Sequence, residues 1–132
     1  MIADDGSVIH DVRLEHPVAR VWTAITDRDA LAAWLMPNDF EARVGHTFQL
    51  DARPSRGFID AEVLELDPPH RIRWRWMIDD TPTTVTITLR TDGEGTLLHL
   101  EHTDLPPDPQ PSFDGGWAEK LRDLASLLKG AS

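Results

Sequence analysis

The stretch that decides the fold is Arg71-Ile72-Arg73-Trp74-Arg75-Trp76-Met77-Ile78. Large apolar side chains occupy its even-numbered positions, and arginines occupy three of the odd ones. Because side chains alternate between the two faces of a strand, this pattern predicts a β-strand with one buried and one wet face. Residues 84–89 alternate threonine with Val, Ile and Leu in the same way, and β-branched residues favour strands. Both stretches are therefore expected in one antiparallel sheet.

Four further stretches show weaker alternation, at residues 8–15, 44–50, 57–66 and 98–102. The third is irregular. If Ala61 and Val63 point inward, then the apolar residues Phe58, Leu64 and Leu66 do not fit a simple alternation. A β-bulge, in which one strand carries an extra residue, resolves such a conflict, so we expect a bulge or a strong twist there.

Apolar spacings of three and four predict three helices. The first follows Pro17 and ends near Thr26, and the second is short, begins at Asp27 or Asp29 as its cap and ends before Pro37. A proline-rich connector at residues 105–111 precedes the third helix, for which Ser112 or Asp114 is the expected cap. The apolar stripe of this long C-terminal helix consists of Trp117, Leu121, Leu124 and Leu128.

The predicted order is one strand, two short helices, the remaining strands with mostly short turns, and one long helix. This order is typical of an α+β fold with an antiparallel sheet of about six to seven strands. The chain has 132 residues, which suits a single domain over residues 1–132.

Composition excludes several classes of function. The net charge of −10 opposes nonspecific binding of nucleic acid and of anionic membrane surfaces, both of which need clustered Lys and Arg. With no cysteine, the chain cannot form disulfides or Cys-ligated metal sites, which fits a reducing cytoplasm. No apolar run reaches the roughly 20 residues of a membrane helix. We therefore expect a soluble cytoplasmic protein.

Five motifs, in order along the chain, resemble homologues of the Hsp-90 ATPase activator in the START/Bet v 1-like (SRPBCC) superfamily. His46 departs from the pattern, because the family usually has a second glycine there. The resemblance implies a helix-grip fold, in which a curved sheet wraps around the C-terminal helix with a cavity between them. The motifs are residues 18–27 with Leu31 and Trp34, Val44-Gly45 with Phe48, residues 63–69 with Ile72 and Trp76, residues 95–102, and Gly116-Trp117.

The candidate site is the space between the sheet and the last helix. Aromatic rings there could line an apolar pocket and offer indole N–H groups to a ligand, or they could simply fill the core. His102 is expected to face inward, either to bind a ligand or to be satisfied by the backbone. The expected lining residues are Trp34, Phe48, Trp74, Trp76, His102, Trp117, Leu121 and Leu124.

Three functions remain open from the sequence. The first is binding of a hydrophobic or amphipathic small molecule in this cavity. The second is a cyclase- or dehydratase-like enzyme that uses His102 as acid–base, although the chain contains no catalytic signature motif. The third is a co-chaperone or stress-response adaptor that acts through its outer surface. We expect no cofactor and no metal, and we leave open a protein partner or a homodimer.

Overall fold

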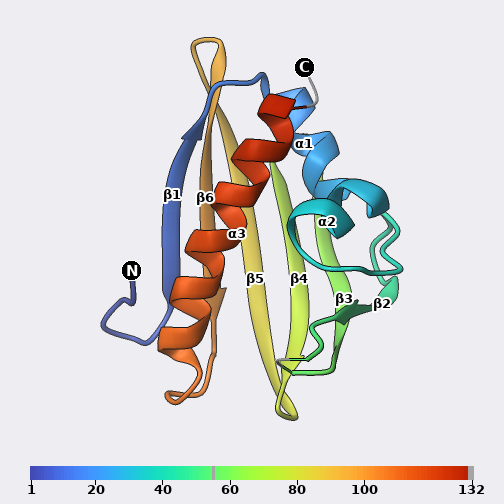
Figure 1. The fold of residues 1–132 in the computed structure, drawn as a ribbon, viewed down its shortest axis with the longest axis vertical. Coiled ribbons are helices and arrows are strands. Elements are labelled where there is room, and N and C mark those ends of the chain that lie inside the picture. The colour runs from blue at the N-terminus through green and yellow to red at the C-terminus, as the bar shows by residue number, and fades with distance from the viewer. Residues whose placement is uncertain (55, 131–132) are drawn as a thin grey trace.

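The computed structural model describes residues 1–54 and 56–130, so the predicted domain span of 1–132 includes three residues outside it. It has a curved, six-stranded antiparallel sheet in the order β1-β6-β5-β4-β3-β2, crossed on one face by a long helix (Figure 1). This is the α+β helix-grip arrangement expected from the sequence. The strands are β1 Val8–Leu14, β2 Thr47–Asp51, β3 Phe58–Asp67, β4 Arg71–Ile78, β5 Thr81–Asp92 and β6 Gly95–Thr103.

The alternating residues of β4 give it one buried face and one exposed face, as predicted. Its four large even-numbered residues are buried, and the arginines lie on the opposite face of the sheet. There Arg75 pairs with Glu62 on β3, while Glu65 pairs with both Arg71 and Arg73. Exposed ion pairs of this kind add at most about 1 kcal/mol each, so the buried face supplies most of the stability.

The irregularity expected in β3 is a β-bulge. The register between β3 and β4 shifts between Val63 and Glu65, which leaves Leu64 as the extra residue. Ala61 and Val63 are buried, as predicted, and Leu64 is exposed. The bulge allows the apolar residues before and after it to follow different alternations without a slip of the whole strand.

Three helices cover the apolar face of the sheet: α1 Val18–Thr26, α2 Arg28–Trp34 and α3 Gln110–Gly130. Asp27 caps α2, because its carboxylate accepts a 2.9 Å hydrogen bond from the backbone N–H of Ala30. All four residues of the predicted α3 stripe are buried. In Figure 1, α3 runs diagonally across the sheet, and α1 and α2 lie beside its C-terminal half.

Two predicted boundaries were wrong. The helix α3 begins at Gln110, two residues before the nearer predicted cap, because Pro111 fits the first turn, where a missing N–H costs nothing. Asp114 instead contacts His10 and the amino group of Met1. The strand β2 begins at Thr47 rather than at Val44, because Gly45 has a φ of +88° and turns the chain before it.

Candidate functional site

Aromatic rings fill much of the space between sheet and helix. Trp76 on β4 lies 6.2 Å from Trp74 and 5.2 Å from Trp117 on α3, measured between ring centroids. Phe40 packs edge-on against Trp74 at 6.3 Å. All four rings are at most 2% exposed. The cavity expected from the resemblance is therefore occupied at this place by side chains.

His102 is fully buried at the end of β6, and neighbouring side chains occupy both of its ring nitrogens. The indole N–H of Trp117 donates to Nδ1 at 3.1 Å, and Nε2 lies 2.8 Å from the hydroxyl of Thr83. That hydroxyl donates its own hydrogen to the carbonyl of Trp76 at 2.8 Å. Since an indole N–H can only donate, His102 must accept at Nδ1 and donate from Nε2. Its tautomer is therefore fixed by its partners.

Burial also fixes the charge of His102. Desolvation lowers the pKa of its imidazole to about 3, because no carboxylate compensates the loss of water around the charged form. At neutral pH the ring is uncharged, and both nitrogens are engaged. The histidine therefore acts as a junction between β6, β5 and α3.

Two buried indole N–H groups lack a hydrogen-bond partner among the described residues. Trp34 donates to the carbonyl of Ala24 at 2.9 Å, and Trp117 donates to His102. By contrast, Nε1 of Trp74 and Nε1 of Trp76 are buried with no acceptor among the described residues. A buried donor without a partner costs roughly 1–3 kcal/mol.

A small apolar recess lies beside Trp76 and Trp117. Its volume is about 90 Å³. Water takes up about 30 Å³ per molecule in the liquid, so the recess has room for a short apolar group but not for a whole ligand. Its walls are made by Leu35, Met36, Trp76, Phe113, Gly116, Trp117 and Lys120.

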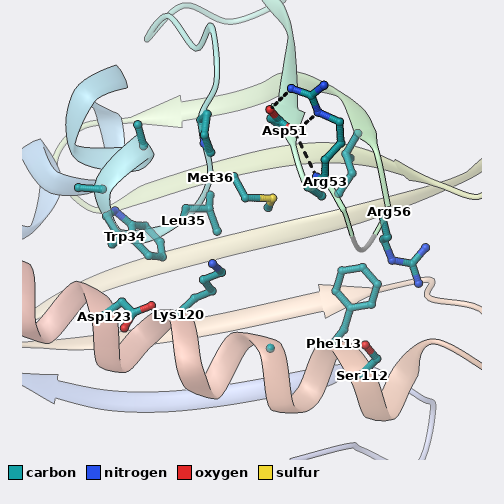
Figure 2. Close-up of a pocket in the computed structure, with 16 residues that line it drawn as sticks. Trp34, Leu35, Met36, Asp51, Arg53, Arg56, Ser112, Phe113, Lys120 and Asp123 are labelled. Carbon is teal, nitrogen blue, oxygen red and sulfur yellow. Dashed lines mark hydrogen bonds and ion pairs between the residues drawn. The ribbon is translucent and has the colours of Figure 1, made fainter.

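The recess adjoins a wider open groove of about 450 Å³, with which it shares five wall residues. The groove is bounded by α2 and the segment after it on one side, by α3 on the other, and by the β2–β3 loop at one end (Figure 2). This volume lies within the range of small-molecule sites. The shared residues are Leu35, Met36, Phe113, Gly116 and Lys120.

The groove wall carries charged groups from the β2–β3 loop. Arg53 binds the carboxylate of Asp51 through two nitrogens, at 2.9 and 2.8 Å, and these hydrogen bonds lower the pKa of Asp51 to about 2. The guanidinium of Arg56 lies 5.0 Å from the centre of the Phe113 ring, a cation–π distance. Figure 2 shows Lys120 rising from α3 toward Leu35 and Met36.

The structure brings together only some of the residues expected at the site. Trp34 lines the groove, and Trp76 and Trp117 line the recess. Phe48 and Leu121 border other surface hollows, the first between β2, β3 and β4 and the second between β1 and α3. The remaining three residues are buried and do not belong to the walls of the groove or the recess; they are Trp74, His102 and Leu124.

Sequence reasoning missed Met36, Phe113, Arg56 and Lys120. One signal was available for Lys120, which lies three residues after Trp117 and hence on the same side of α3. The same spacing was available for Phe113, which lies four residues before Trp117 in α3. Met36 and Arg56 lie in irregular segments, where no periodicity indicates the direction of a side chain.

The described part of the chain contains no group of three or more His, Cys, Asp or Glu residues that could hold a metal ion. Of its helices, none is both long enough and apolar enough to cross a membrane.

Residues 15–129 match the model of a protein family described as activator of Hsp90 ATPase homolog 1-like protein. The chain belongs to this family. The match includes α1, α2, all of the groove and recess walls, and the His102 junction. Among curated proteins, no match to the chain was found.

Solved structures of similar proteins agree with this assignment to the activator of Hsp90 ATPase homolog 1-like family. Protein MLL2253 from Mesorhizobium loti is 30% identical, with a TM-score of 0.88 over 96% of this chain and 98% of that chain. CalU16 from Micromonospora echinospora is 26% identical, with a TM-score of 0.82 over 97% of this chain and 81% of that chain. The Aha1 dimer from Colwellia psychrerythraea shares the fold, at 21% identity and a TM-score of 0.83 over 92% of this chain and 95% of that chain.

Proposed function

We propose that this protein binds a hydrophobic or amphipathic small molecule in the groove between α2 and α3, with an apolar end of the ligand in the recess beside Trp76 and Trp117. The observation that carries the proposal is the connection between the two spaces. An apolar recess of about 90 Å³ opens into a groove of about 450 Å³ and shares five wall residues with it.

Burial of apolar surface would supply most of the affinity. At about 25 cal/mol per Å², a ligand that buries about 200 Å² of apolar surface gains roughly 5 kcal/mol before the entropic costs of association. Such a site would accept a family of related amphiphiles and rank them by apolar length.

One similar solved structure also supports a small-molecule role. DynU16, a putative protein in the dynemicin biosynthetic locus, is 26% identical, with a TM-score of 0.85 over 98% of this chain and 49% of that chain. A protein in a biosynthetic locus works among small molecules, and this chain shares its fold over almost its full length.

Filling the recess is the sharpest test. Gly116 lines both spaces, and a Cβ atom built on it meets no atom within 4 Å. We expect Gly116→Leu to keep or raise the unfolding free energy, because glycine in a helix costs up to about 1 kcal/mol. The same change should abolish binding of Nile red, a neutral apolar dye, measured by its fluorescence.

Gly115→Leu is the matched control. Gly115 is the preceding residue on α3, also has open space around it, and lies outside both walls. This variant should bind Nile red like the original protein. If the dye binds both variants equally, the groove is not the binding site and the proposal fails.

The enzyme alternative lacks a supporting observation. Acid–base catalysis in a dry pocket needs two titratable groups near a common point. Of the described side chains, His102 is the single buried titratable one, and protein partners engage both of its nitrogens.

The adaptor alternative would require a continuous exposed apolar patch. Among the described residues, the exposed large apolar side chains are Met1 and Ile2 before β1, Val44 before β2, and Phe58 and Leu64 on β3. The N–H of Gly45 binds the carbonyl of Val63, so Val44 and Leu64 lie on adjoining segments, whereas Met1 and Ile2 lie at the other edge of the sheet, beside β1. Phe58 lies under the guanidinium of Arg53, at 4.7 Å from its ring centre. A small-molecule site therefore has the better support.

A further inference from the structure

The groove differs in charge from the rest of the protein. The whole chain carries 13 Lys and Arg against 23 Asp and Glu. The groove wall reverses this balance, with three cations, Arg53, Arg56 and Lys120, against two carboxylates, Asp51 and Asp123. An acidic protein with a locally cationic groove has a field that favours an anionic group at that place over the remaining surface.

Lys120 is the cation best placed to meet a ligand. It is the single charged residue in the wall of the recess, whose other walls are aromatic, aliphatic or glycine. Its ammonium group has neither a hydrogen bond nor an ion pair with any residue that the structure describes. Three donor hydrogens are therefore free on a side chain that lines both the recess and the groove.

Arg56 lines the same groove but is not a wall residue of the recess. Its guanidinium stacks over Phe113, a residue of both walls, and one of its nitrogens lies 3.2 Å from each carboxylate oxygen of Asp79. Asp79 is 74% exposed, so its hold on Arg56 is weakened by solvent. Arg53, by contrast, is already committed to Asp51 through two short hydrogen bonds.

We infer that the ligand is an amphiphile with an anionic head group, which places the end of its apolar chain in the recess and its head group on Lys120 in the groove. This inference rests on the proposed function and specifies the class of ligand. A medium-chain carboxylate is its simplest example. The apolar recess and the cation at its mouth match the two ends of such a molecule, because a charged oxygen and an ammonium form a charge-assisted hydrogen bond.

Three probes with the same apolar chain and different head groups test the contribution of the head group to binding. They are octanoate, 1-octanol and octylamine. We expect octanoate to bind roughly three- to tenfold more tightly than 1-octanol, the range for a partly exposed charged hydrogen bond, and octylamine to bind most weakly. The measurement is isothermal titration calorimetry at low salt, with tryptophan fluorescence as a second readout because Trp76 and Trp117 line the recess.

Variants on α3 then assign the preference to Lys120. Lys120→Met should lower the affinity for octanoate to that for 1-octanol and leave 1-octanol unchanged. Asp123→Asn removes a carboxylate from the groove wall and should raise the affinity for octanoate about twofold. Arg122→Met, on the side of α3 that faces β1, is the control and should change neither.

Failure of this inference is distinguishable from failure of the proposed function. Equal affinity of the original protein for octanoate and 1-octanol would overturn the anionic head group and leave apolar binding intact. A loss of both ligands in Lys120→Met would show that the lysine acts through packing and would overturn its role as the head-group partner. Absence of binding for all three probes would overturn the proposed function together with this inference.

Discussion

Hydrogen bonds of fixed direction link His102 on β6 to three other elements. Trp117 of α3 donates to it, it donates to Thr83 of β5, and Thr83 donates to the backbone of β4. The alternation within β6 was sufficient to predict that this histidine faces inward. Its partners lie on other elements, up to 19 residues away, and spacing within one strand carries no information about them. The sequence therefore predicted that His102 faces inward, but not that side chains of other elements engage both of its ring nitrogens.

Removing a member of this chain of hydrogen bonds should destabilise the protein. We expect Thr83→Val, which keeps the shape and removes the hydroxyl, to cost about 1–3 kcal/mol, because it leaves the N–H of His102 and the carbonyl of Trp76 unpaired. His102→Ala should cost at least as much, since it leaves the N–H of Trp117 without an acceptor and opens a cavity at a fully buried position. The measurement is the unfolding free energy from urea titration.

The double variant provides the check on coupling. If the three groups act as one unit, the cost of both changes together should be clearly less than the sum of the single costs. Strict additivity, or a Thr83→Val variant as stable as the original, would contradict the hydrogen-bond directions assigned to His102.

At the scale of elements, periodicity predicted the types of all nine but not all of their ends. The core stripe of α3 was correct, because residues spaced by three and four share one helix face. Its start was wrong, because proline can either precede a helix or occupy its first turn. The groove walls were missed for a similar reason, since the segment after α2 and the β2–β3 loop have no period.

The sequence left open whether Asp27 or Asp29 caps α2, and the structure identifies Asp27 as the cap. Asp27 accepts the N–H of Ala30, whereas Asp29 lies within the first turn. We expect Asp27→Ala to lower the unfolding free energy by about 1 kcal/mol and Asp29→Ala to lower it by less than half as much, because Asp29 contributes only through the helix dipole. Thermal and urea unfolding of both variants measure this difference. Equal losses would contradict the assignment of Asp27 as the cap.

At the scale of the whole molecule, the order of strands and helices predicted the helix-grip fold, and five motifs in order predicted the family. The degree to which side chains fill the interior could not be predicted. Whether Trp74, Trp76 and Trp117 enclose a space or occupy it depends on rotamers and on the distance between α3 and the sheet, and the composition is the same in both cases. The resulting site is an open groove with a small recess at the edge of the core, rather than a cavity enclosed between the sheet and α3.

The unfolding free energy of the whole molecule should depend on pH through two histidines, His102 and His99. His102 has an ordinary pKa of 6.5 when unfolded and about 3 when folded, so below pH 6.5 the unfolded chain binds a proton that the native protein does not. The unfolding free energy should therefore fall as the pH falls, by roughly 2 kcal/mol between pH 6.5 and 4.5. His99 acts in the opposite direction. Hydrogen bonds to Glu101 and Asp11 raise its pKa above 6.5, so its contribution is present at lower pH and is lost as the pH rises through the raised value.

Urea unfolding at pH values from 4.5 to 8 measures both effects. His102→Gln should remove most of the decline between pH 6.5 and 4.5, because no group with a depressed pKa then remains at that position. His99→Gln is the control and should leave that decline in place while it reduces the loss at higher pH. The ring protons of His102 provide an independent check by NMR, since their chemical shifts should not titrate above pH 4. A titration of this ring near pH 6.5 would show that water reaches it and would contradict the sealed interior on which the placement of the site depends.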